Sequence, residues 1–408
     1  MSGPHAGMTH LESSTSFEGS NISLLGSNVS VIVIAPPLRF QAEAHTTSPQ
    51  IDHQLKSISA HTEPAWSAPG LGSKPGIWSW VVQDFKLVPF KTGDLGSGEL
   101  HEGDSYIICR SVAPVASKPD VLIHDIFFWL GSKTSQDEAG VAAYKSVELD
   151  EFLGRSPTQH REVQSLESST FLSLFHPHLV ITLGGNASGF HHVDHAASIH
   201  LSSPRLWKIS QPDKKHVKVQ EVKAEAESID RGDVFILDLG DKLLQWNGGK
   251  SAPMEKAKAA ETARSWVDAR DGKATLQVFD DGQGDSAFFL ALGVPQNSLP
   301  FTPATNAIQI PPQSSQATST STCISLLSSD SSASATPTSF SRSHLSPPSL
   351  KLVIPARPPP IPAYIWVGSE VPMEETRFAF VRAQKFVHGR GLIAVKEGRE
   401  GEGFERDV

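Results

Sequence analysis

Two sets of residues in this chain have the types and spacing to bind a hard divalent cation. The first set is Gly103, Asp104 and Glu138, and the second is Gly232, Asp233 and Glu255. Such a cation needs several oxygen ligands, supplied by carboxylates and backbone carbonyls together. Glycine lets the backbone approach closely, the aspartate beside it adds charge, and a glutamate at a helix start adds two more oxygens. Each set could therefore form a site for a hard divalent cation.

The same residues also have a structural explanation. An aspartate at this position can simply begin a turn, and a glutamate in the first turn of a helix complements the partial positive charge of the helix N-terminus. Residue types alone leave both explanations open. Both explanations require that the Gly-Asp pair lead into a strand and that the glutamate begin a helix.

The elements that would hold these residues recur three times along the chain. Trp129, Trp246 and Trp366 each end an apolar run of strand character, and a glycine follows two residues later. A glutamate lies nine residues after each tryptophan and begins a segment of helix-forming composition: Glu138–Leu153, Glu255–Asp268 and Glu375–Val387. A short strand and a phenylalanine-bearing segment then complete each copy. The sequence predicts a repeated strand–turn–helix–strand–helix unit.

Composition sets the predicted boundaries. Residues 1–60 are expected to be a disordered N-terminal region, 61–193 the first repeat and 204–294 the second. Residues 295–363 are rich in Ser, Thr and Pro and are expected to be a low-complexity linker, because they bury too little apolar surface to offset their ordering entropy. Residues 364–408 are expected to be a partial third repeat. They lack the Gly-Asp pair and the leading strands that would close a sheet.

Several classes of protein are excluded by composition. The chain has 408 residues, with 35 Lys and Arg against 44 Asp and Glu and a net charge of −9, so nucleic-acid binding is not expected. Two cysteines, Cys109 and Cys323, cannot staple a secreted fold. We find no apolar run of about 18 residues for a membrane span and no signal peptide, so we expect a cytoplasmic protein. We find no catalytic arrangement and do not expect an enzyme; His191, His192 and His195 are not expected to bind metal.

Longer stretches carry a family resemblance. They include Gln159-His-Arg-Glu-Val-Gln164, Val147-Glu-Leu-Asp150, and Asp230-Arg-Gly-Asp-Val-Phe-Ile-Leu-Asp-Leu-Gly240. With these stretches the chain resembles the gelsolin/villin superfamily, specifically the three-repeat severin and fragmin type. The resemblance implies an α+β fold of tandem repeats, each a mixed β-sheet between one long and one short helix. It also implies calcium-regulated severing and barbed-end capping of actin filaments in the cytoskeleton.

The resemblance assigns roles to the metal-binding candidates. The Gly-Asp pair and the glutamate of each full repeat match the family's intradomain calcium site, and a backbone carbonyl near Asn186 would complete the first of them. Asp150 matches a carboxylate that shares a second calcium ion with actin, with carbonyls between Gly154 and Pro157 as further ligands. Glu375 lacks its Gly-Asp partner, so no site is assigned to the third unit.

The segment from Gln136 to Leu153 has two apolar faces if it is helical. One face is expected to pack on the sheet, and the opposite face carries Val141, Tyr144 and Phe152 together with Glu148. That second face could dock into an apolar cleft of a partner or be buried against a neighbouring repeat. The resemblance implies the first, because this helix of repeat 1 wedges into actin at the barbed end.

Basic residues gather at the start of the second repeat. They are Lys208, Lys214, Lys215, His216 and Lys218. Lys214, Lys215 and Lys218 could contact acidic actin on the filament side, and these three together with Lys208 could contact phosphoinositide headgroups. A charged strand edge that discourages pairing explains the cluster equally well. The family also has a basic run late in the first repeat, but Phe175–Gly185 contains no Lys or Arg.

Two functions remain open at this point. The chain could sever filaments and cap barbed ends under calcium control. Alternatively, it could cap ends or hold actin monomers without severing, because its third repeat is incomplete.

Overall fold

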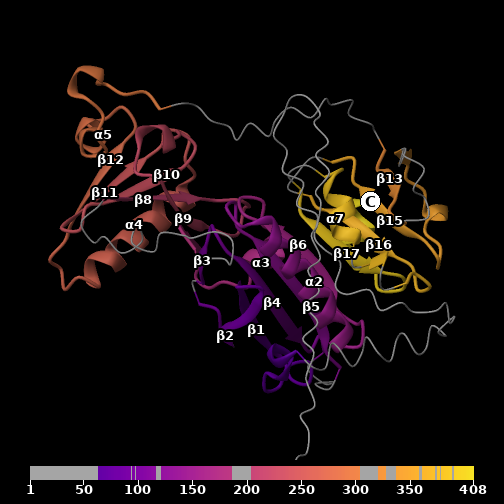
Figure 1. Cartoon of the computed structure of the whole chain (residues 1–408). Coiled ribbons are helices and arrows are strands. Elements are labelled where there is room, and N and C mark those ends of the chain that lie inside the picture. Colours follow the sequence, from indigo (N-terminus) through magenta and orange to yellow (C-terminus); the bar gives the residue numbers. More distant parts are fainter. Residues whose placement is uncertain are drawn as a thin grey trace, which may run out of the picture. The chain divides into compact units, whose positions relative to one another are not determined.

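The computed structural model describes residues 63–92, 94–96, 98–115, 121–185, 204–303, 320–327, 337–357, 361–372, 375–376, 378–387 and 390–408. The N-terminal region 1–60, Asn186 and the three histidines at 191, 192 and 195 lie outside these ranges. Figure 1 shows the described elements coloured along the chain. No helix in these ranges is both long enough and apolar enough to cross a bilayer.

The first repeat contains seven strands and two α-helices within the described ranges. Its elements are η1 (Pro64–Ser67), β1 (Gly76–Gln83), β2 (Lys86–Thr92), β3 (Glu99–His101), β4 (Ser105–Val112), β5 (Ile123–Leu130), α2 (Gln136–Phe152), β6 (Thr158–Val163), α3 (Ser169–Leu172) and β7 (Leu179–Thr182). The predicted helix is α2, which begins with a capping box between Ser135 and Glu138. Trp129 lies in β5, as its apolar run predicted, and Cys109 is a buried core residue of β4.

The second repeat follows the same order. Its elements are β8 (Arg205–Ser210), β9 (Lys218–Val222), η3 (Ala226–Ser228), β10 (Val234–Asp238), β11 (Lys242–Asn247), α4 (Pro253–Asp268), β12 (Thr275–Asp280), α5 (Ser286–Ala291) and η4 (Gln296–Ser298). In both repeats the Gly-Asp pair leads into a strand and the glutamate lies in the first turn of the long helix, as predicted.

The prediction of a truncated third repeat was wrong. Its elements are β13 (Thr322–Ser325), β14 (Thr338–Ser339), η6 (Arg342–His344), β15 (Leu350–Ile354), β16 (Ala363–Val367), α7 (Ala379–Gln384), β17 (Leu392–Lys396) and α8 (Glu402–Asp407). Strands β13, β14 and β15 lie inside the segment predicted to be a linker, and they supply the leading strands that the sequence appeared to lack. Short apolar runs such as Leu350–Ile354 form them, although the flanking residues are rich in Ser and Pro. The third repeat therefore spans residues 320–408.

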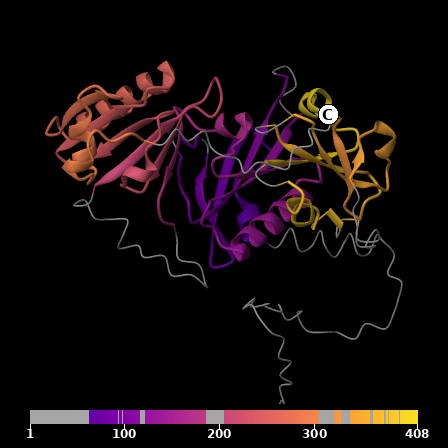
Figure 2. The same ribbon diagram turned by 90° about the horizontal axis from the view of Figure 1, so that it is seen from above.

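The strands join into two sheets rather than three. One has the order β14-β13-β15-β16-β17-β6-β5-β4-β1-β2, and the other β12-β11-β10-β8-β9-β7-β3. Strand β17 of the third repeat pairs antiparallel with β6 of the first, at Leu392–Arg161, Ile393–His160 and Ala394–Gln159. Strands β3 and β7 of the first repeat extend the sheet of the second. Figures 1 and 2 show the first repeat, coloured indigo to magenta, beside the third, coloured orange to yellow, and Figure 1 labels β6 and β17 at this junction.

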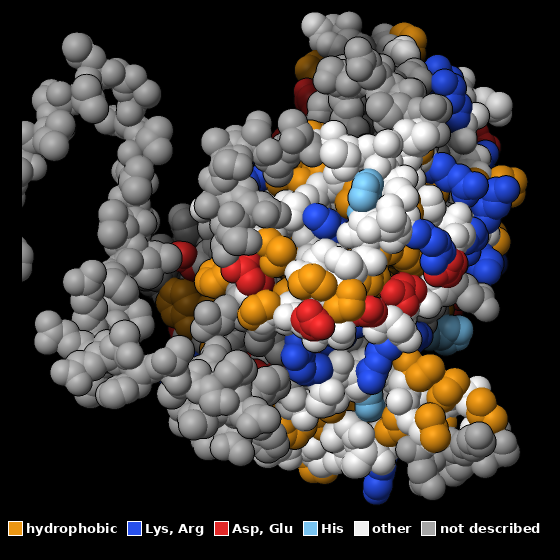
Figure 3. Space-filling model, turned by 90° about the vertical axis from the view of Figure 1, so that its right-hand side faces the viewer, with side chains coloured by type: hydrophobic (Ala, Val, Ile, Leu, Met, Phe, Trp, Pro, Cys, Tyr) orange, Lys and Arg blue, Asp and Glu red, His pale blue; other side chains and the backbone are white. Residues whose placement is uncertain are grey.

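The first and second repeats each have the predicted sheet between one longer and one shorter helix, whereas α7 and α8 of the third repeat have six residues each. In the first repeat, α2 residues such as Ala142 and Leu149 pack in one core cluster, and Phe171 of α3 packs in another. In the second, Ala259 of α4 and Phe288 of α5 belong to two separate clusters in the same way. The cluster under α2 also contains residues of the third repeat, including Phe380 of α7. Figure 3 shows exposed apolar side chains in small groups among polar ones on one face of the molecule.

The repeated tryptophans share one polar contact. The indole N–H of Trp129 donates to Glu167 at 3.4 Å, that of Trp246 to Asp285 at 3.1 Å, and that of Trp366 to Glu400 at 2.7 Å. Each tryptophan is buried, so its N–H needs a partner inside the protein. Each carboxylate lies shortly before or at the start of the short helix. The contact thus fixes that helix against the sheet in all three repeats.

The glycine two residues after each tryptophan meets the backbone of the loop before the preceding strand. A Cβ at Gly131 would lie 2.2 Å from the carbonyl oxygen of Glu102, and one at Gly368 would lie 2.1 Å from that of Pro347. The backbone N–H groups of these glycines donate to the carbonyls of Asp104 and Ser349 at 3.0 Å each. Ser349 therefore occupies the position of Asp104, and the third repeat has Pro-Ser in place of Gly-Asp.

The close approach at the corresponding glycine of the second repeat gives a stability prediction. A Cβ at Gly248 would lie 2.5 Å from the carbonyl oxygen of Asp233 and 2.6 Å from that of Arg231. We expect Gly248→Ala to destabilise the second repeat by about 2 kcal/mol, because neither carbonyl can move without breaking its hydrogen bond. Gly140→Ala is the control: no heavy atom lies within 4 Å of its Cβ position in α2, and we expect a gain of about 0.5–1 kcal/mol. Equal unfolding midpoints in urea for the two variants would contradict this explanation.

A half-buried histidine where the first two repeats join gives a pH prediction. Burial, together with the positive charge of Lys258, lowers the pKa of His178 to about 4, while Glu261 opposes this effect. An unfolded histidine titrates near about 6.5, so the unfolded chain binds a proton before the folded one does. Stability should therefore fall as the pH drops from about 6.5 towards 4. We expect His178→Gln to reduce this loss in melting temperatures measured across that range, and His344→Gln in the third repeat to leave it unchanged; a wild-type slope in His178→Gln would refute the assignment.

Candidate metal and partner-binding sites

The structure brings Gly103, Asp104 and Glu138 together at the start of β4 and α2. The two carboxyl groups come from elements 34 positions apart in sequence, and both residues are at least 96% buried. The hydroxyl of Tyr106 donates to Oδ2 of Asp104 at 3.2 Å. A Cβ at Gly185 would lie 2.6 Å from Oδ1 of Asp104, so the backbone of that glycine borders the carboxylate closely.

The electrostatics of this set fit a cation. Burial raises the pKa of Glu138, and the negative charge of Asp104 raises it further, although hydrogen bonds from Ser135 and Thr134 oppose the shift. Oε2 of Glu138 accepts those bonds at 3.5 Å from the Ser135 amide and 3.3 Å from the Thr134 hydroxyl. Glu138 is thus a helix cap, as the structural explanation required. It also lies close enough to Asp104 for the two negative charges to repel each other, which a bound Ca²⁺ would relieve.

In the second repeat a lysine side chain lies among the corresponding acids. Nζ of Lys208 lies 2.6 Å from Oδ2 of Asp233 and 2.6 Å from Oδ2 of Asp230. Burial raises the pKa of Asp233, and the Lys208 ammonium opposes that rise. Glu255 accepts the amides of Gln211 and Ala252 at 2.7 Å each. Burial and then the charge of Asp233 raise the pKa of Glu255.

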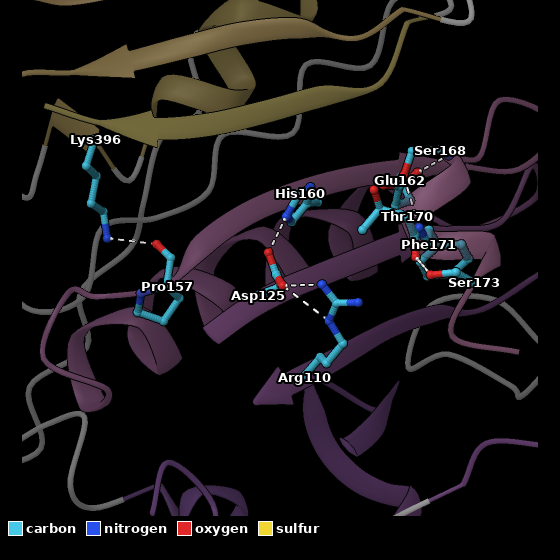
Figure 4. A network of polar contacts seen from close by, with 10 residues as sticks. All are labelled: Arg110, Asp125, Pro157, His160, Glu162, Ser168, Thr170, Phe171, Ser173 and Lys396. Carbon is cyan, nitrogen blue, oxygen red and sulfur yellow. Dashed lines mark hydrogen bonds and ion pairs between the residues drawn. The ribbon is translucent and has the colours of Figure 1, made fainter. Parts of the chain in front are cut away.

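The cluster around Asp150 also contains an ammonium group. Nζ of Lys396 in β17 lies 2.5 Å from Oδ1 of Asp150, 2.9 Å from the carbonyl oxygen of Arg155 and 3.3 Å from that of Pro157. Figure 4 shows Lys396 reaching across from the third repeat to Pro157. Gly154 and Arg155 have φ values of 69° and 57°, which turn the chain sharply at this point. These are the carboxylate and carbonyl oxygens expected to hold the second calcium ion.

Burial opposes both charges of this ion pair. The Asp150 side chain is 1% exposed and that of Lys396 is 14% exposed. Burial raises the pKa of Asp150 in spite of the lysine beside it, and burial lowers the pKa of Lys396 in spite of the aspartate. A buried pair of this kind contributes little net stability, whereas removal of one partner leaves an uncompensated charge.

The third repeat has no equivalent of the Gly-Asp-Glu set. Ser349 takes the aspartate position, and its hydroxyl donates to the carbonyl of Ser346 at 2.8 Å. Glu375 forms an ion pair with Arg382. Within the described ranges no group of three or more His, Cys, Asp or Glu side chains could hold a metal ion. The predicted calcium sites therefore depend on backbone carbonyls as well as two carboxylates, and Asn186, which was expected to contribute one, lies outside these ranges.

The four residues predicted to wedge into a partner differ in exposure. Tyr144 is 43% exposed, whereas Val141 and Phe152 are half-buried against the core shared by the first and third repeats. Glu148 is only 4% exposed, and it accepts a hydrogen bond from Lys145 at 2.9 Å. This face of α2 is therefore partly exposed, as docking to a partner requires, and partly buried, as packing against a neighbouring repeat requires.

The basic residues predicted to cluster at the start of the second repeat also differ in their exposure to solvent. Lys214 and Lys215 are exposed, and His216 bonds Asp213 at 2.7 Å. Lys218 is buried and pairs with Glu167 at 3.0 Å, and Lys208 is held by Asp230 and Asp233. Only Lys214 and Lys215 present their side chains to solvent in this conformation.

Sequence reasoning missed Lys396 and Asp230 as members of these sites. Lys396 contacts Asp150 across 246 positions of sequence, and no local pattern connects the two. Asp230 lies three residues before Asp233, in the stretch that carries the family resemblance. This short spacing was the one sequence signal that could have identified it as a member of the site.

A polar network fixes the strand that carries the repeat junction. Asp125 of β5 accepts hydrogen bonds from Arg110 at 2.7 and 3.2 Å, and its other oxygen lies 3.0 Å from Nε2 of His160 in β6 (Figure 4). The His160 ring stacks on Phe127 with a centroid distance of 4.4 Å. Since neighbouring residues of a strand point to opposite faces, Arg161 faces α2.

Comparison with known proteins gives a consistent result. The family model described as "Gelsolin repeat" matches residues 86–172 and 215–288. Gelsolin-like protein 1 of Lumbricus terrestris is 44% identical over 210 residues, which cover 52% of this chain and 54% of that protein. Severin of Echinococcus granulosus is 36% identical over 233 residues, covering 56% and 60%. The chain thus spans about half the length of these relatives.

A solved structure was also matched. It is described as the crystal structure of the Thorarchaeota 2DGel3/rabbit actin complex, with 22% identity over 53% of this chain and 98% of that one. Its TM-score of 0.22 is too low to support an argument.

Proposed function

Since the chain belongs to the gelsolin/villin superfamily, we propose that it is a calcium-regulated actin-binding protein that severs filaments and caps their barbed ends. The observation that best supports this proposal is the oxygen cluster of Asp150, Arg155 and Pro157, which holds a cationic group from another repeat. Oxygens that hold an ammonium at these distances suit a metal cation as well. When bound there, Ca²⁺ would supply the positive charge that Lys396 supplies in this conformation.

The cluster couples cation binding to the joint between the first and third repeats. Lys396 belongs to β17, the strand that pairs with β6. Once its ammonium leaves Asp150, the side chain loses its only carboxylate partner in the described part of the chain, and an unpaired buried lysine disfavours the joined conformation. Separation of β17 from β6 would expose the face of α2 that carries Ala139, Gly140 and Ala143, which line the junction with α7 next to Tyr144. The helix could then present one continuous apolar face to actin.

The second repeat would bind the filament side in this proposal. Lys214 and Lys215 are exposed and can contact acidic groups of actin or phosphoinositide headgroups, whereas Lys208 and Lys218 would first have to leave their ion pairs. The mechanism consists of binding alone, with no covalent step, and we place the protein at the actin cytoskeleton.

Severing is favoured over capping alone by one finding. The alternative rested on an incomplete third repeat, but β13, β14 and β15 complete its sheet. A folded third repeat joined to the first can hold α2 covered until calcium arrives, which capping or monomer binding alone does not require.

The role of Lys396 can be tested by calorimetry. We expect Lys396→Gln to bind Ca²⁺ about tenfold more tightly at the Asp150 cluster, which corresponds to about 1.4 kcal/mol, because the competing ammonium is gone. The exposed Lys273→Gln is the matched control. Hydrogen exchange of β17 without calcium gives a second readout, and it should become faster in Lys396→Gln only. Identical calcium isotherms and exchange rates in both variants would refute the competition.

The function itself can be tested with pyrene-labelled actin filaments. With calcium the full chain should raise the number of filament ends within seconds and block barbed-end growth, and a chelator should abolish both effects. We expect Tyr144→Ala to weaken these activities by a factor of about 10 to 100, as loss of a central aromatic anchor does. Phe378→Ala, another exposed aromatic, should change neither. Capping without new ends would support the alternative, and absence of any effect on actin would overturn the proposal.

A further inference from the structure

A second feature of the repeat junction is a cavity of about 710 Å³ between α2, β6 and α7. Its walls come from both the first and the third repeat. They are formed by Phe128, Leu130, Gln136, Ala139, Gly140, Ala143, Arg161, Val163, Phe380, Val381, Gln384, Lys385, Val387 and Arg390. Among these residues there are three cationic side chains and no acidic one, and most of the others are apolar.

Arg161 is the notable wall residue. It is 9% exposed, and within the described ranges it forms no ion pair and its side chain no hydrogen bond. Burial lowers its pKa to about 10, with no acidic neighbour to oppose the shift. A guanidinium stays charged at neutral pH, so this cavity holds a positive charge that no acidic side chain of the described ranges compensates. Buried charges are normally paired.

A second arginine reinforces the charge. Arg390 lies two residues before Leu392, which pairs with Arg161 across the β6–β17 junction. It is 7% exposed, and its contacts are two long hydrogen bonds to the carbonyls of Ile361 at 3.3 Å and Pro355 at 3.5 Å. Lys385 adds an exposed ammonium to the cavity wall.

The rest of the cavity is apolar and comes from both repeats. Phe128 of β5 and Phe380 of α7 meet edge to face with ring centroids 5.0 Å apart. Leu130 and Val387 extend this lining. A cavity of this size with apolar walls and a few convergent polar groups is typical of a small-molecule site.

We propose that this cavity binds an anionic amphiphile, a molecule with one carboxylate or phosphate-monoester head paired with Arg161 and Arg390 and an alkyl chain packed along Phe128 and Phe380. The head forms charge-assisted hydrogen bonds with the guanidinium groups, and the chain displaces water from the apolar walls. The site is separate from the exposed lysines of the second repeat, and the inference does not depend on actin binding.

Such a ligand would also hold the first and third repeats together. The cavity exists only while β17 lies against β6, because each repeat contributes part of its wall. A molecule that binds one conformation and not the other shifts the equilibrium towards the conformation it binds. The ligand would therefore oppose the separation that calcium is proposed to favour.

Calorimetry on the full chain without calcium tests the proposal, with laurate and dodecyl phosphate below their micelle concentrations as probes. We expect one molecule of at least one probe to bind per chain, and the tighter of the two identifies the preferred head. Arg161→Gln should weaken that binding at least tenfold. Arg264→Gln, which removes an exposed arginine of the second repeat, should leave it unchanged.

Two further probes separate the parts of the ligand. Dodecanol lacks the charge and inorganic phosphate lacks the chain, so each should bind at least tenfold more weakly than the charged amphiphile. No binding of either amphiphile, equal binding to Arg161→Gln, or equal binding of dodecanol or of phosphate would overturn the proposal.

A stability measurement guards against a misfolded variant. Without ligand, Arg161→Met should melt at a higher temperature than the wild type, because it replaces an unpaired buried charge with an apolar side chain of similar length. Laurate or dodecyl phosphate should raise the melting temperature of the wild type and not that of Arg161→Met. A lower melting temperature for ligand-free Arg161→Met would show that Arg161 is stabilised by the protein itself and would contradict the inference.

Discussion

The antiparallel pairing of β6 with β17 is the contact on which the other features of this molecule depend. Each strand is the last of its own repeat's sheet, where it pairs in parallel with β5 or β16 and leaves its other edge open. Open strand edges pair readily with any available strand. Here three residue pairs join the two edges and turn two sheets into one of ten strands. The junction brings Lys396 to Asp150, closes the cavity at Arg161, and covers part of α2.

The charges at this junction oppose the backbone pairing. Burial raises the pKa of Asp150 and lowers that of Lys396, and Arg161 lies buried without an acidic partner in the described part of the chain. Backbone hydrogen bonds and apolar contacts such as Phe128–Phe380 hold the repeats together, whereas the desolvated charges favour their separation. An interface balanced in this way can be shifted by a ligand with a modest difference in affinity between the two conformations. A cation at Asp150 and an anion at Arg161 would shift it in opposite directions.

The sequence predicted those parts of the fold that recur locally. Trp129, Trp246 and Trp366 are spaced identically from their glycines because each tryptophan donates to a carboxylate near the short helix and each glycine touches a loop carbonyl. The third leading strand was missed because Pro-Ser replaces Gly-Asp before β15, so the marker of that strand disappeared although its apolar run remained. The contact of Lys396 with Asp150 could not be predicted, because only the pairing of two distant strand edges creates it.

Lysine side chains in the acidic clusters link these observations. Lys208 bridges Asp230 and Asp233 within the second repeat, and Lys396 bridges from the third repeat to Asp150 of the first. In both places the ammonium compensates carboxylates whose burial would otherwise be costly. Displacement of the ammonium has different consequences in the two places, however. Lys208 can leave its aspartates without separating any repeats, since all three residues belong to one sheet and its adjoining turn. Lys396 cannot leave Asp150 without weakening the β6–β17 junction, and for that reason the Asp150 cluster is the one in which cation binding and the exposure of α2 are coupled.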